Sequence, residues 1–286
     1  MPVYAVDHVV RLGETIAACG FAEHCGGKGF NQAIALARAG APVSFAGAIG
    51  PDGEMLVRAL EADAIDTSFL MRFEVPTGHA IIQVTPRGQN SIVVSSGANG
   101  AISPDDADAV LSHFSVGDWV VLQNEISSLE HILKVCVEKG MKVALTPSPF
   151  DERMRQLDLD GIDYLLINET EGAELTGISN PEGILSALHR SYPALFVVLT
   201  LGGAGGMFLG SDGSVCQYSA CEVSAVDTTA AGDTFAGFFI AEAIAGSPAG
   251  YAVDVARTAS ALAVIRHGAA CSIPYRHEVD ERLKGD

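Results

Sequence analysis

The stretch DTTAAGDTFAGFF, residues 227–239, places two aspartates six residues apart around a run of small residues. An apolar helix pattern follows directly, so Asp233 falls in the first turn of the expected helix. Small residues at 230–232 leave backbone N–H groups uncovered at a helix N-terminus, where negative charge is stabilised. A carboxylate beside such a site is positioned to accept a proton from an attacking hydroxyl group. A helix-capping role also explains Asp233, but it does not explain the small residues ahead of it.

A glycine-rich turn near the start of the chain is a second candidate site. The stretch HCGGKGF, residues 24–30, places Lys28 among glycines directly before a helix expected from about Asn31. Glycines allow a ligand to approach the backbone, and a helix start offers free N–H groups. The turn is not a P-loop, because Lys28 is followed by Gly29 instead of Ser or Thr. A plain strand-to-helix turn with a solvated lysine is the alternative interpretation.

Two further stretches follow predicted strands, at the edge where α/β proteins bind ligands. The loop TLGGAGG, residues 200–206, does not match a dinucleotide-binding motif, because position 208 is Phe and a strand follows. It indicates a loop against which a flat ligand or a phosphate can lie, or a plain glycine-rich turn. The stretch NETE, residues 168–171, carries oxygen ligands that suit Mg²⁺. An acidic helix N-terminus that complements the helix dipole explains it equally well.

The order of the predicted elements places these stretches in an α/β fold. From residue 117 onward, short β-branched runs alternate with amphipathic helix patterns, which predicts parallel βαβ units and helices on both faces of a sheet. Residues 66–97 alternate apolar and polar positions and turn at PRGQN, which predicts a hairpin with one exposed face. Together with residues 8–25, this segment is expected to form a small β lid outside the main sheet. Another hairpin is expected over 207–219, and no linker divides residues 1–286 into two domains.

The composition restricts the class of partner. Among 286 residues, 35 acidic side chains oppose 17 Lys and Arg, so the net charge of −18 argues against nucleic acid and anionic membranes as partners. The start lacks a signal-peptide pattern, and the longest apolar stretches, about 235–245 and 259–265, are too short to span a bilayer. Six cysteines without a C-x-x-C pair indicate reduced thiols, so we expect a soluble cytoplasmic protein.

Five motifs in a fixed order give the sequence a resemblance to a known family. GGKGFNQ, GAN at 97–99, NETE, TLGGAG and DTTAAGDTF resemble the PfkB carbohydrate kinases over about residues 11–274. The resemblance implies a ribokinase-like doubly wound, mostly parallel sheet, a β lid over the sugar site and a homodimer formed through that lid. It also implies transfer of the γ-phosphoryl group of ATP to a sugar hydroxyl, with the 5-hydroxyl of D-ribose as the expected acceptor.

The resemblance assigns roles to residues of this chain. Asp233 is expected to be the base, with the amides of Ala230, Ala231 and Gly232 as the anion hole. The expected sugar-binding residues are Gly27, Lys28, Gly29, Asn31, Glu125 and Asp233. The expected ATP-binding residues are Asn168, Thr200, Leu201, Gly202, Gly203, Ala204, Gly205, Gly232 and Arg257. Mg²⁺ is expected near Asn168 and Glu171. A monovalent cation, K⁺, is expected near Asp227, Thr229, Ala263, Arg266, Gly268 and Ser272.

The sequence departs from the family pattern in three places. Family members begin with a strand and a G-S-x-N-x-D motif whose aspartate binds the sugar, whereas here the first strand is expected to be missing and Asp7 aligns beyond that motif. A missing strand would expose the edge of its neighbour. Phe30 replaces a small residue of the glycine turn, and His79 replaces an aliphatic lid residue. A kinase for fructose, 2-keto-3-deoxygluconate or a nucleoside, or a catalytically weak binding protein, therefore stays an alternative.

Overall fold

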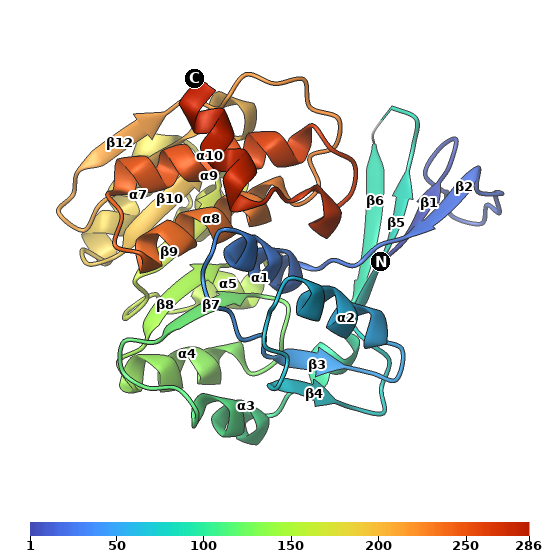
Figure 1. The fold of residues 1–286 in the computed structure, drawn as a ribbon, viewed down its shortest axis with the longest axis horizontal. Helices are drawn as coiled ribbons and strands as arrows, with labels where there is room; N and C mark the ends of the chain where they lie inside the picture. The colour runs from blue at the N-terminus through green and yellow to red at the C-terminus, as the bar shows by residue number, and fades with distance from the viewer. Residues whose placement is uncertain (88, 286) are drawn as a thin grey trace.

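A six-stranded sheet forms the centre of the protein in the computed structural model, which describes residues 1–87 and 89–285. The strand order is β12-β11-β10-β9-β8-β7 (Figure 1). Strands β7 to β10 are parallel to one another, whereas β11 is antiparallel to both of its neighbours, β10 and β12. The strands are β7 (Trp119–Gln123), β8 (Lys142–Thr146), β9 (Tyr164–Asn168), β10 (Phe196–Thr200), β11 (Gly206–Leu209) and β12 (Val215–Tyr218). The doubly wound sheet and the hairpin predicted over 207–219 are confirmed.

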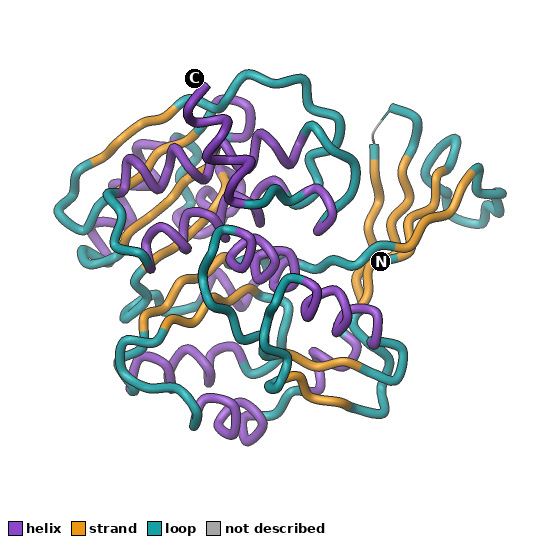
Figure 2. Tube along the Cα trace, in the orientation of Figure 1, coloured by secondary structure: helices purple, strands orange, loops and turns teal. Residues whose placement is uncertain are grey.

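Helices cover both faces of this sheet, because alternate residues of the buried strands point to opposite sides. Leu166 and Val198 pack with one group of helices, whereas Leu165 and Val197 pack with the other group. The first group is α1 (Lys28–Arg38), α2 (Glu54–Ala62), α8 (Ala231–Ile244), α9 (Ala249–Val264) and α10 (Arg276–Gly285). The second group is α3 (Pro104–Leu111), α4 (Leu129–Glu138), α5 (Glu152–Gln156), α6 (Glu169–Thr176) and α7 (Pro181–Ser191). Figure 2 shows these helices around the strands.

The contact between α1 and α8 requires a glycine. A Cβ atom at Gly237 would lie 2.4 Å from the Cβ of Ala35 and 2.9 Å from the backbone nitrogen of Leu36. The hydrogen side chain of Gly237 therefore allows the two helices to approach closely. This approach matters for the site, because both helices begin at the carboxyl edge of the sheet and bring their N-termini together there.

A second sheet forms the lid, which projects away from the body of the molecule (Figure 1). Its order is β2-β1-β5-β6, with β1 (Pro2–Ala5), β2 (Gly20–Glu23), β5 (His79–Val84) and β6 (Asn90–Ser95). The predicted hairpin is the antiparallel pair of β5 and β6. The lid differs from the expected one at the N-terminus, because β1 belongs to it, pairing in parallel with β5 and antiparallel with β2.

A third sheet has two strands, and one of them lies in the segment 66–97 that was predicted to belong to the lid. The segment from residue 66 was expected in the lid, but β4 (Leu70–Arg72) pairs in parallel with β3 (Gly47–Ile49) beside the main sheet. Phe73 N donates to Ile49 O at 2.9 Å and Phe45 N donates to Asp66 O at 2.8 Å. Parallel pairing of strands this far apart in the chain leaves no local sequence signal. The lid hairpin therefore starts only at β5.

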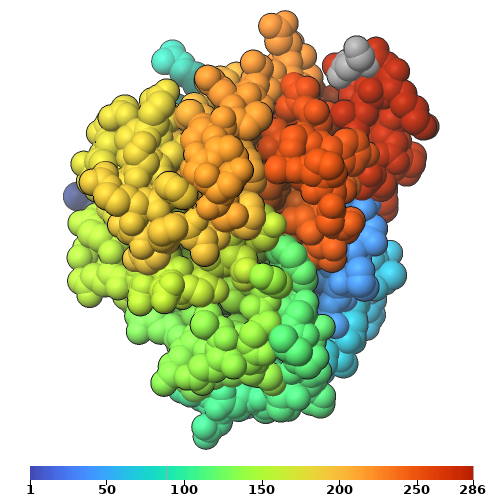
Figure 3. Space-filling model, turned by 90° about the vertical axis from the view of Figure 1, so that its left-hand side faces the viewer, coloured from blue at the N-terminus to red at the C-terminus, as the bar shows by residue number. Residues whose placement is uncertain are grey.

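The remaining short elements are 3-10 turns at Gly97–Ala101, Gly202–Ala204 and Ala270–Ser272. In the space-filling view of Figure 3, the orange and red C-terminal part of the chain lies next to a blue segment from its N-terminal part. In the described part of the chain, no helix combines the length and the apolar character needed to cross a membrane. All six cysteines are free.

Candidate active site

The N-terminus of α8 carries the central group of the site. The helix begins at Ala231 without a side-chain cap, and its N-cap residue Ala230 has a left-handed conformation with φ 60°. Ala231 N donates to Thr228 O at 3.2 Å, whereas the N–H groups of Gly232 and Asp233 have no acceptor in the described part of the chain. Of the amides predicted to form an anion hole over 230–232, that of Ala231 is therefore already hydrogen-bonded, whereas that of Gly232 is not. No atom lies within 4 Å of a Cβ placed on Gly232, so the space in front of this end is open.

Asp233 is buried, with 8% of its surface exposed, and both of its carboxylate oxygens are held by side chains of α1. Asn31 Nδ2 donates to Oδ2 at 2.8 Å and Gln32 Nε2 donates to Oδ1 at 3.2 Å. Burial raises the pKa of Asp233 above its ordinary value, while the charge of Lys28 and these two hydrogen bonds oppose the rise. The carboxylate is thus fixed in orientation and poised to take up a proton.

Gln32 and Gln123 complete this support, and the sequence analysis did not identify either of them. Gln123 Nε2, at the end of β7, donates to Gln32 Oε1 at 2.7 Å. This bond fixes the Gln32 amide with its nitrogen toward Asp233. Asn31 Oδ1 is buried without a partner in the described part of the chain, which leaves an open acceptor next to the carboxylate. Gln32 is the last residue of the motif GGKGFNQ, and its place in this motif was the sequence signal that could have identified it.

The glycine turn and the end of β7 supply a second carboxylate. Gly29 N donates to Glu125 Oε2 at 3.3 Å, and Gly27 is the N-cap of α1 with φ 122°. The helix starts at Lys28, earlier than the predicted start near Asn31. Burial raises the pKa of Glu125, the Gly29 N–H lowers it, and the nearby charge of Asp233 raises it further.

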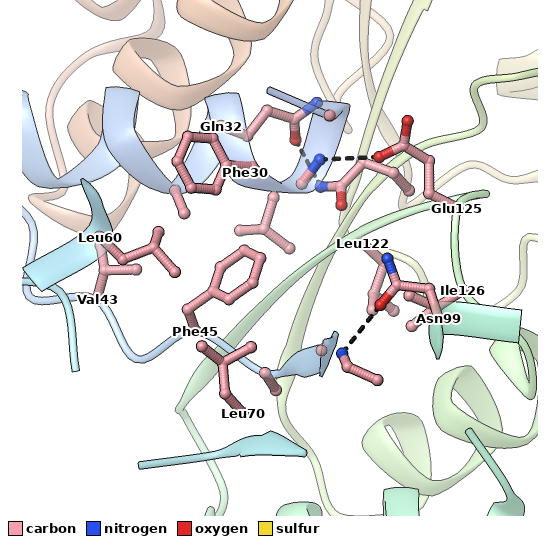
Figure 4. Close-up of a pocket in the computed structure, with 18 of the residues that line it drawn as sticks. Phe30, Gln32, Val43, Phe45, Leu60, Leu70, Asn99, Leu122, Glu125 and Ile126 are labelled. Carbon is pink, nitrogen blue, oxygen red and sulfur yellow. Dashed lines mark hydrogen bonds between the residues drawn. The ribbon is translucent and has the colours of Figure 1, made fainter. Parts of the chain in front are cut away.

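A cavity of about 750 Å³ opens between this turn, β7, β3 and the lid. Its polar lining includes Gln32, Asn99 and Glu125; Figure 4 shows Asn99 and Glu125 on one side of the cavity and Gln32 next to Phe30. Phe30 is buried in the apolar part, 6.4 Å from Phe45 between ring centres. His79 lines the lid side, and its Nδ1 lies 3.1 Å from Thr77 O. Asp7 is not among the residues that line the cavity, and its Oδ1 accepts from Cys19 Sγ at 3.4 Å.

The N-terminus of α6, predicted to lie near ATP and Mg²⁺, closes on itself. Glu171 N donates to Asn168 Oδ1 at 2.9 Å, and Asn168 N donates to Glu171 Oε2 at 3.0 Å. This capping box occupies one oxygen of each side chain. Glu171 nevertheless lies close enough to Asp233 for its charge to raise the pKa of Asp233. The described residues contain no group of three or more His, Cys, Asp or Glu that could hold a metal by themselves.

The loop after β10 has the open backbone expected for a ligand surface. Gly202 has φ 56°, Gly205 has φ 99°, and no atom lies within 4 Å of a Cβ placed on Gly202 or Gly203. A Cβ at Gly205 would lie 2.8 Å from the carbonyl carbon of Ser219. Arg257 Nη1 donates to Ser219 O at 3.3 Å, so the structure brings the predicted Arg257 to the same segment. Thr200, Leu201 and Ala204 complete this loop.

The two segments predicted to hold a monovalent cation lie together. Asp227 Oδ1 accepts from Thr229 N and Oδ2 accepts from Gly268 N, each at 2.9 Å. Val226 N and Asp227 N both donate to Val264 O. Burial raises the pKa of Asp227, but these hydrogen bonds outweigh burial and hold it below the ordinary value. Ala263 and Ser272 are buried beside this contact, whereas the Arg266 guanidinium pairs with Glu278 at 2.6 Å.

Comparison with known proteins places these features in one family. Residues 2–276 match the model of the pfkB family carbohydrate kinases. The chain is 33% identical to the ribokinase of Haemophilus influenzae over 290 residues, covering 99% of this chain and 94% of that protein. It is 35% identical to the ribokinase of Schizosaccharomyces pombe, covering 94% and 90%. The structure of Arabidopsis thaliana ribokinase complexed with ribose and ATP superposes with a TM-score of 0.85 at 30% identity, covering 99% and 95%.

Proposed function

Because the chain belongs to the pfkB family of carbohydrate kinases, we propose that it transfers the γ-phosphoryl group of ATP to the 5-hydroxyl of D-ribose. The relatives that are named ribokinases, and the Arabidopsis structure complexed with ribose and ATP, support this substrate pair. The observation that carries the proposal is the buried carboxylate of Asp233 beside the free N–H of Gly232 at the start of α8.

Asp233 acts as the base in the proposed reaction. Its carboxylate accepts the proton of the sugar hydroxyl while that oxygen attacks the γ-phosphorus in line with the leaving ADP oxygen. Asn31 and Gln32 hold the two carboxylate oxygens, so the base does not rotate out of position. The N–H groups of Gly232 and Asp233 stabilise the negative charge that develops on the transferring group.

The sugar is proposed to lie between the glycine turn and the end of β7. Gly27, Gly29 and Glu125 line the polar part of the cavity and offer hydroxyl partners. Lys28 supplies a positive charge near both Asp233 and Glu125. The unpartnered Oδ1 of Asn31 fits a sugar hydroxyl donor, because a buried acceptor without a hydrogen bond is unfavourable.

ATP is proposed to lie along the loop 200–205, with Asn168, Gly232 and Arg257 as further contacts. The open space at Gly202 and Gly203 allows a flat base or a phosphate to approach the backbone. Mg²⁺ fits near Asn168 and Glu171, because it needs only one or two carboxylates when phosphates and waters supply the other ligands. When bound, it neutralises charge on the β- and γ-phosphates.

A monovalent cation, K⁺, fits between the segments joined by Asp227. Backbone and hydroxyl oxygens suit such a hard ion, and the chain offers them at Thr229, Ala263, Arg266, Gly268 and Ser272. The Asp227 carboxylate accepts hydrogen bonds from Thr229 N and Gly268 N, which link the Gly268 loop to the segment that leads into α8. A bound cation would therefore support the position of the anion hole.

A homodimer through the lid and a cytoplasmic location are also proposed, with residues 1–286 as one domain. Ile92, Val93 and Val94 are exposed on β6, and Phe21 is exposed on β2. Exposed apolar side chains on a sheet are typical of protein interfaces. Free cysteines agree with a reducing compartment.

A second function is favoured by one observation, the unpaired outer edge of β7 in the described part of the chain. If the sugar site is incomplete there, the protein would bind a sugar or nucleotide with weak turnover. A kinase for fructose, 2-keto-3-deoxygluconate or a nucleoside is the other alternative.

Sugar-dependent release of ADP tests these functions. We expect D-ribose to stimulate ADP release more than the other sugars and nucleosides in a panel, and K⁺ to increase the rate. Preference for another acceptor would reassign the substrate. No stimulation by any acceptor, together with measurable ATP binding by calorimetry, would favour the binding protein.

A further inference from the structure

Arg38 is the last residue of α1, and its guanidinium group is held between two parts of the molecule. On one side lies Asp63, the residue that follows α2. Arg38 Nε donates to Asp63 Oδ1 at 2.9 Å, and Nη2 donates to Oδ2 at 3.0 Å. The two side chains are only 13% and 7% exposed, so neither charge is well solvated and each depends on the other. This paired contact fixes the plane of the guanidinium group.

The other edge of the guanidinium group donates to the backbone of a distant loop. Arg38 Nη1 donates to Ile273 O at 2.6 Å and to Ala270 O at 3.1 Å. The ring of Tyr275 lies against the same group, 4.5 Å from the guanidinium carbon to the ring centre. An ion pair with Asp63 alone requires only a positive charge, whereas donating to two further carbonyls requires the several N–H groups of a guanidinium. Arg38 therefore joins α1 and the end of α2 to the segment 270–275.

This segment belongs to the loop 265–273, which carries three positions proposed for the monovalent cation. The carbonyl oxygens of these residues, Arg266, Gly268 and Ser272, accept no hydrogen bond in the described part of the chain. In contrast, Ala269 O accepts from both Ser272 N and Ser272 Oγ, at 3.0 and 2.8 Å. Unused carbonyl oxygens are suitable ligands for a hard monovalent cation. The residues present in the loop thus fit the proposed ion.

Side chains from two distant parts of the chain hold this loop. Asp227 Oδ2 accepts from Gly268 N at 2.9 Å near its beginning, and Arg38 holds Ala270 and Ile273 near its end. Gly268 has φ 98°, and Ala270–Ser272 form a single 3-10 turn. A loop with so little regular secondary structure has few backbone hydrogen bonds of its own, so its shape depends on such side-chain contacts.

The same helix also supports the proposed base. Asn31, in the first turn of α1, donates to Asp233 Oδ2 at 2.8 Å. Arg38 follows Asn31 by seven residues, which is two turns or about 10 Å along one face of the helix. One end of α1 therefore holds Asp233, and the other end holds the loop 265–273.

We propose that Arg38 is a positioning residue for the monovalent cation, a role that rests on the cation site proposed above. Its hydrogen bonds to Ala270 and Ile273 hold the loop in the shape that places the carbonyls of Gly268 and Ser272 for the ion. A site that is formed in advance binds more tightly than one that the ligand must order. Arg38 thereby sets the concentration at which the cation acts, although it is not among the residues proposed to bind ATP or the sugar.

Two variants remove the hydrogen bonds to the loop in different ways. Arg38→Lys keeps a positive charge beside Asp63, but an ammonium group cannot reproduce the four hydrogen bonds of the guanidinium. The double substitution Arg38→Met with Asp63→Leu removes both buried charges together, so that no unpaired charge is left to destabilise the fold. Arg276→Lys is the matched control, because Arg276 on α10 pairs with the carboxylates of Glu242 and Asp280 instead of with the loop backbone.

The test titrates each chain with KCl, using choline chloride to keep the ionic strength constant, and measures the thermal midpoint and amide hydrogen exchange at Ser272. In the original chain, saturating KCl should raise the midpoint by about 3 °C or more and slow this exchange. Both Arg38 variants should need at least about tenfold more KCl for the same shift, and Ser272 should exchange faster without KCl. Their kcat at saturating KCl should change less than about threefold.

Arg276→Lys should respond to KCl as the original chain does. An unchanged KCl requirement in both Arg38 variants, with a clear shift in the original chain, would overturn the role of Arg38 alone. An equal rise of the requirement in Arg276→Lys would attribute the effect to general loss of stability and would also overturn it. If KCl has no effect on the original chain, the cation site is wrong and this proposal fails with it. Sugar-dependent ADP release tests the proposed kinase activity separately, because the midpoint and the exchange are measured without ATP or sugar.

Discussion

Two helices begin at the carboxyl edge of the main sheet and satisfy their first turns in different ways. α6 closes its own end, because Asn168 and Glu171 exchange hydrogen bonds with each other's backbone N–H groups. α8 has no side-chain cap, and the N–H of Gly232 has no acceptor in the described part of the chain. A capped helix end has fewer free N–H groups with which to bind an anion, whereas an uncapped end keeps them available.

The third residue of each helix is an acid, Glu171 in α6 and Asp233 in α8. The two acids have different hydrogen-bond partners. One carboxylate oxygen of Glu171 accepts from the backbone N–H of Asn168, the N-cap residue of the same helix. This contact involves no other helix. Asp233 makes no cap and is held by Asn31 and Gln32 of α1. Equal position and charge in the sequence therefore do not imply equal function.

The largest expected effect comes from neutralising the two acids in parallel. Asp233→Asn should lower kcat by about 10²–10⁴, because the base is removed, while ribose and ATP affinities change only a few-fold. Glu171→Gln is the matched control, because Gln still closes a capping box. Its kcat at saturating Mg²⁺ should fall much less. Steady-state ADP release and calorimetric titration measure both, and near-normal turnover of Asp233→Asn would remove Asp233 from the mechanism.

The second expected effect comes from a methyl group at the open end of α8. Gly232→Ala meets no atom within 4 Å, so the folded state should gain about 0.5–1 kcal/mol from helix propensity. The methyl group enters the space proposed for the phosphoryl group, so kcat should fall at least about tenfold.

Gly250→Ala provides the control for this variant. Gly250 is the second residue of α9, as Gly232 is of α8, and it also has open space around it. The Gly250→Ala variant should show a similar increase in the free energy of unfolding by urea, and its kcat should not change. Equal turnover of both variants would show that the end of α8 binds no phosphoryl group.

A third effect concerns pH and the support of Asp233. Burial already raises the pKa of this acid, and Gln32→Met removes a donor that opposes the rise. The base must be ionised, so kcat/KM rises with pH through this pKa, and the acid limb should move to higher pH in the variant. Gln123→Met, which leaves the bond from Gln32 in place, should move the limb less. A pH profile of kcat/KM measures the shift, and an unmoved limb for Gln32→Met would show that its amide does not act on Asp233.

The same raised pKa affects stability with a definite sign. Because the folded pKa of Asp233 lies above the unfolded one, its contribution to stability is full below about pH 3.9 and is lost as pH rises through the folded pKa. The unfolding free energy of Asp233→Asn relative to the original chain should therefore rise over this pH window. Urea unfolding at several pH values checks this, and a difference that falls with pH would contradict it.

The smallest expected effect is confined to the two N-cap positions. Asn168→Ala should lower the unfolding free energy by about 1 kcal/mol, because the capping box is lost. Ala230→Gly should raise it by about 1 kcal/mol, because Gly adopts the left-handed conformation without the steric penalty of a Cβ. Urea unfolding at neutral pH measures both, and changes of the same sign would contradict the assigned geometry.

The sequence predicted those elements whose signals are local. The alternation of strands and helices after residue 117, the hairpin over 207–219 and the helix with Asp233 in its first turn follow from short-range periodicity and turn residues. The predicted lid was wrong at β4 and incomplete at β1, because strand partners are chosen by packing between distant segments. No short-range pattern distinguishes a lid strand from a strand beside the main sheet.

The candidate site divides in the same way. By itself the sequence determined which residues stand at strand ends and helix starts. It therefore placed Asn168 and the 200–205 loop at the carboxyl edge of the sheet and Asp233 in the first turn of a helix. Only the tertiary structure decided that Gln32 holds Asp233, that Gln123 fixes Gln32, and that an apolar cavity lies open between β7 and β3. Helix starts and strand ends are set by neighbours in the chain, whereas a hydrogen bond between residues about 200 positions apart exists only after α1 and α8 pack together.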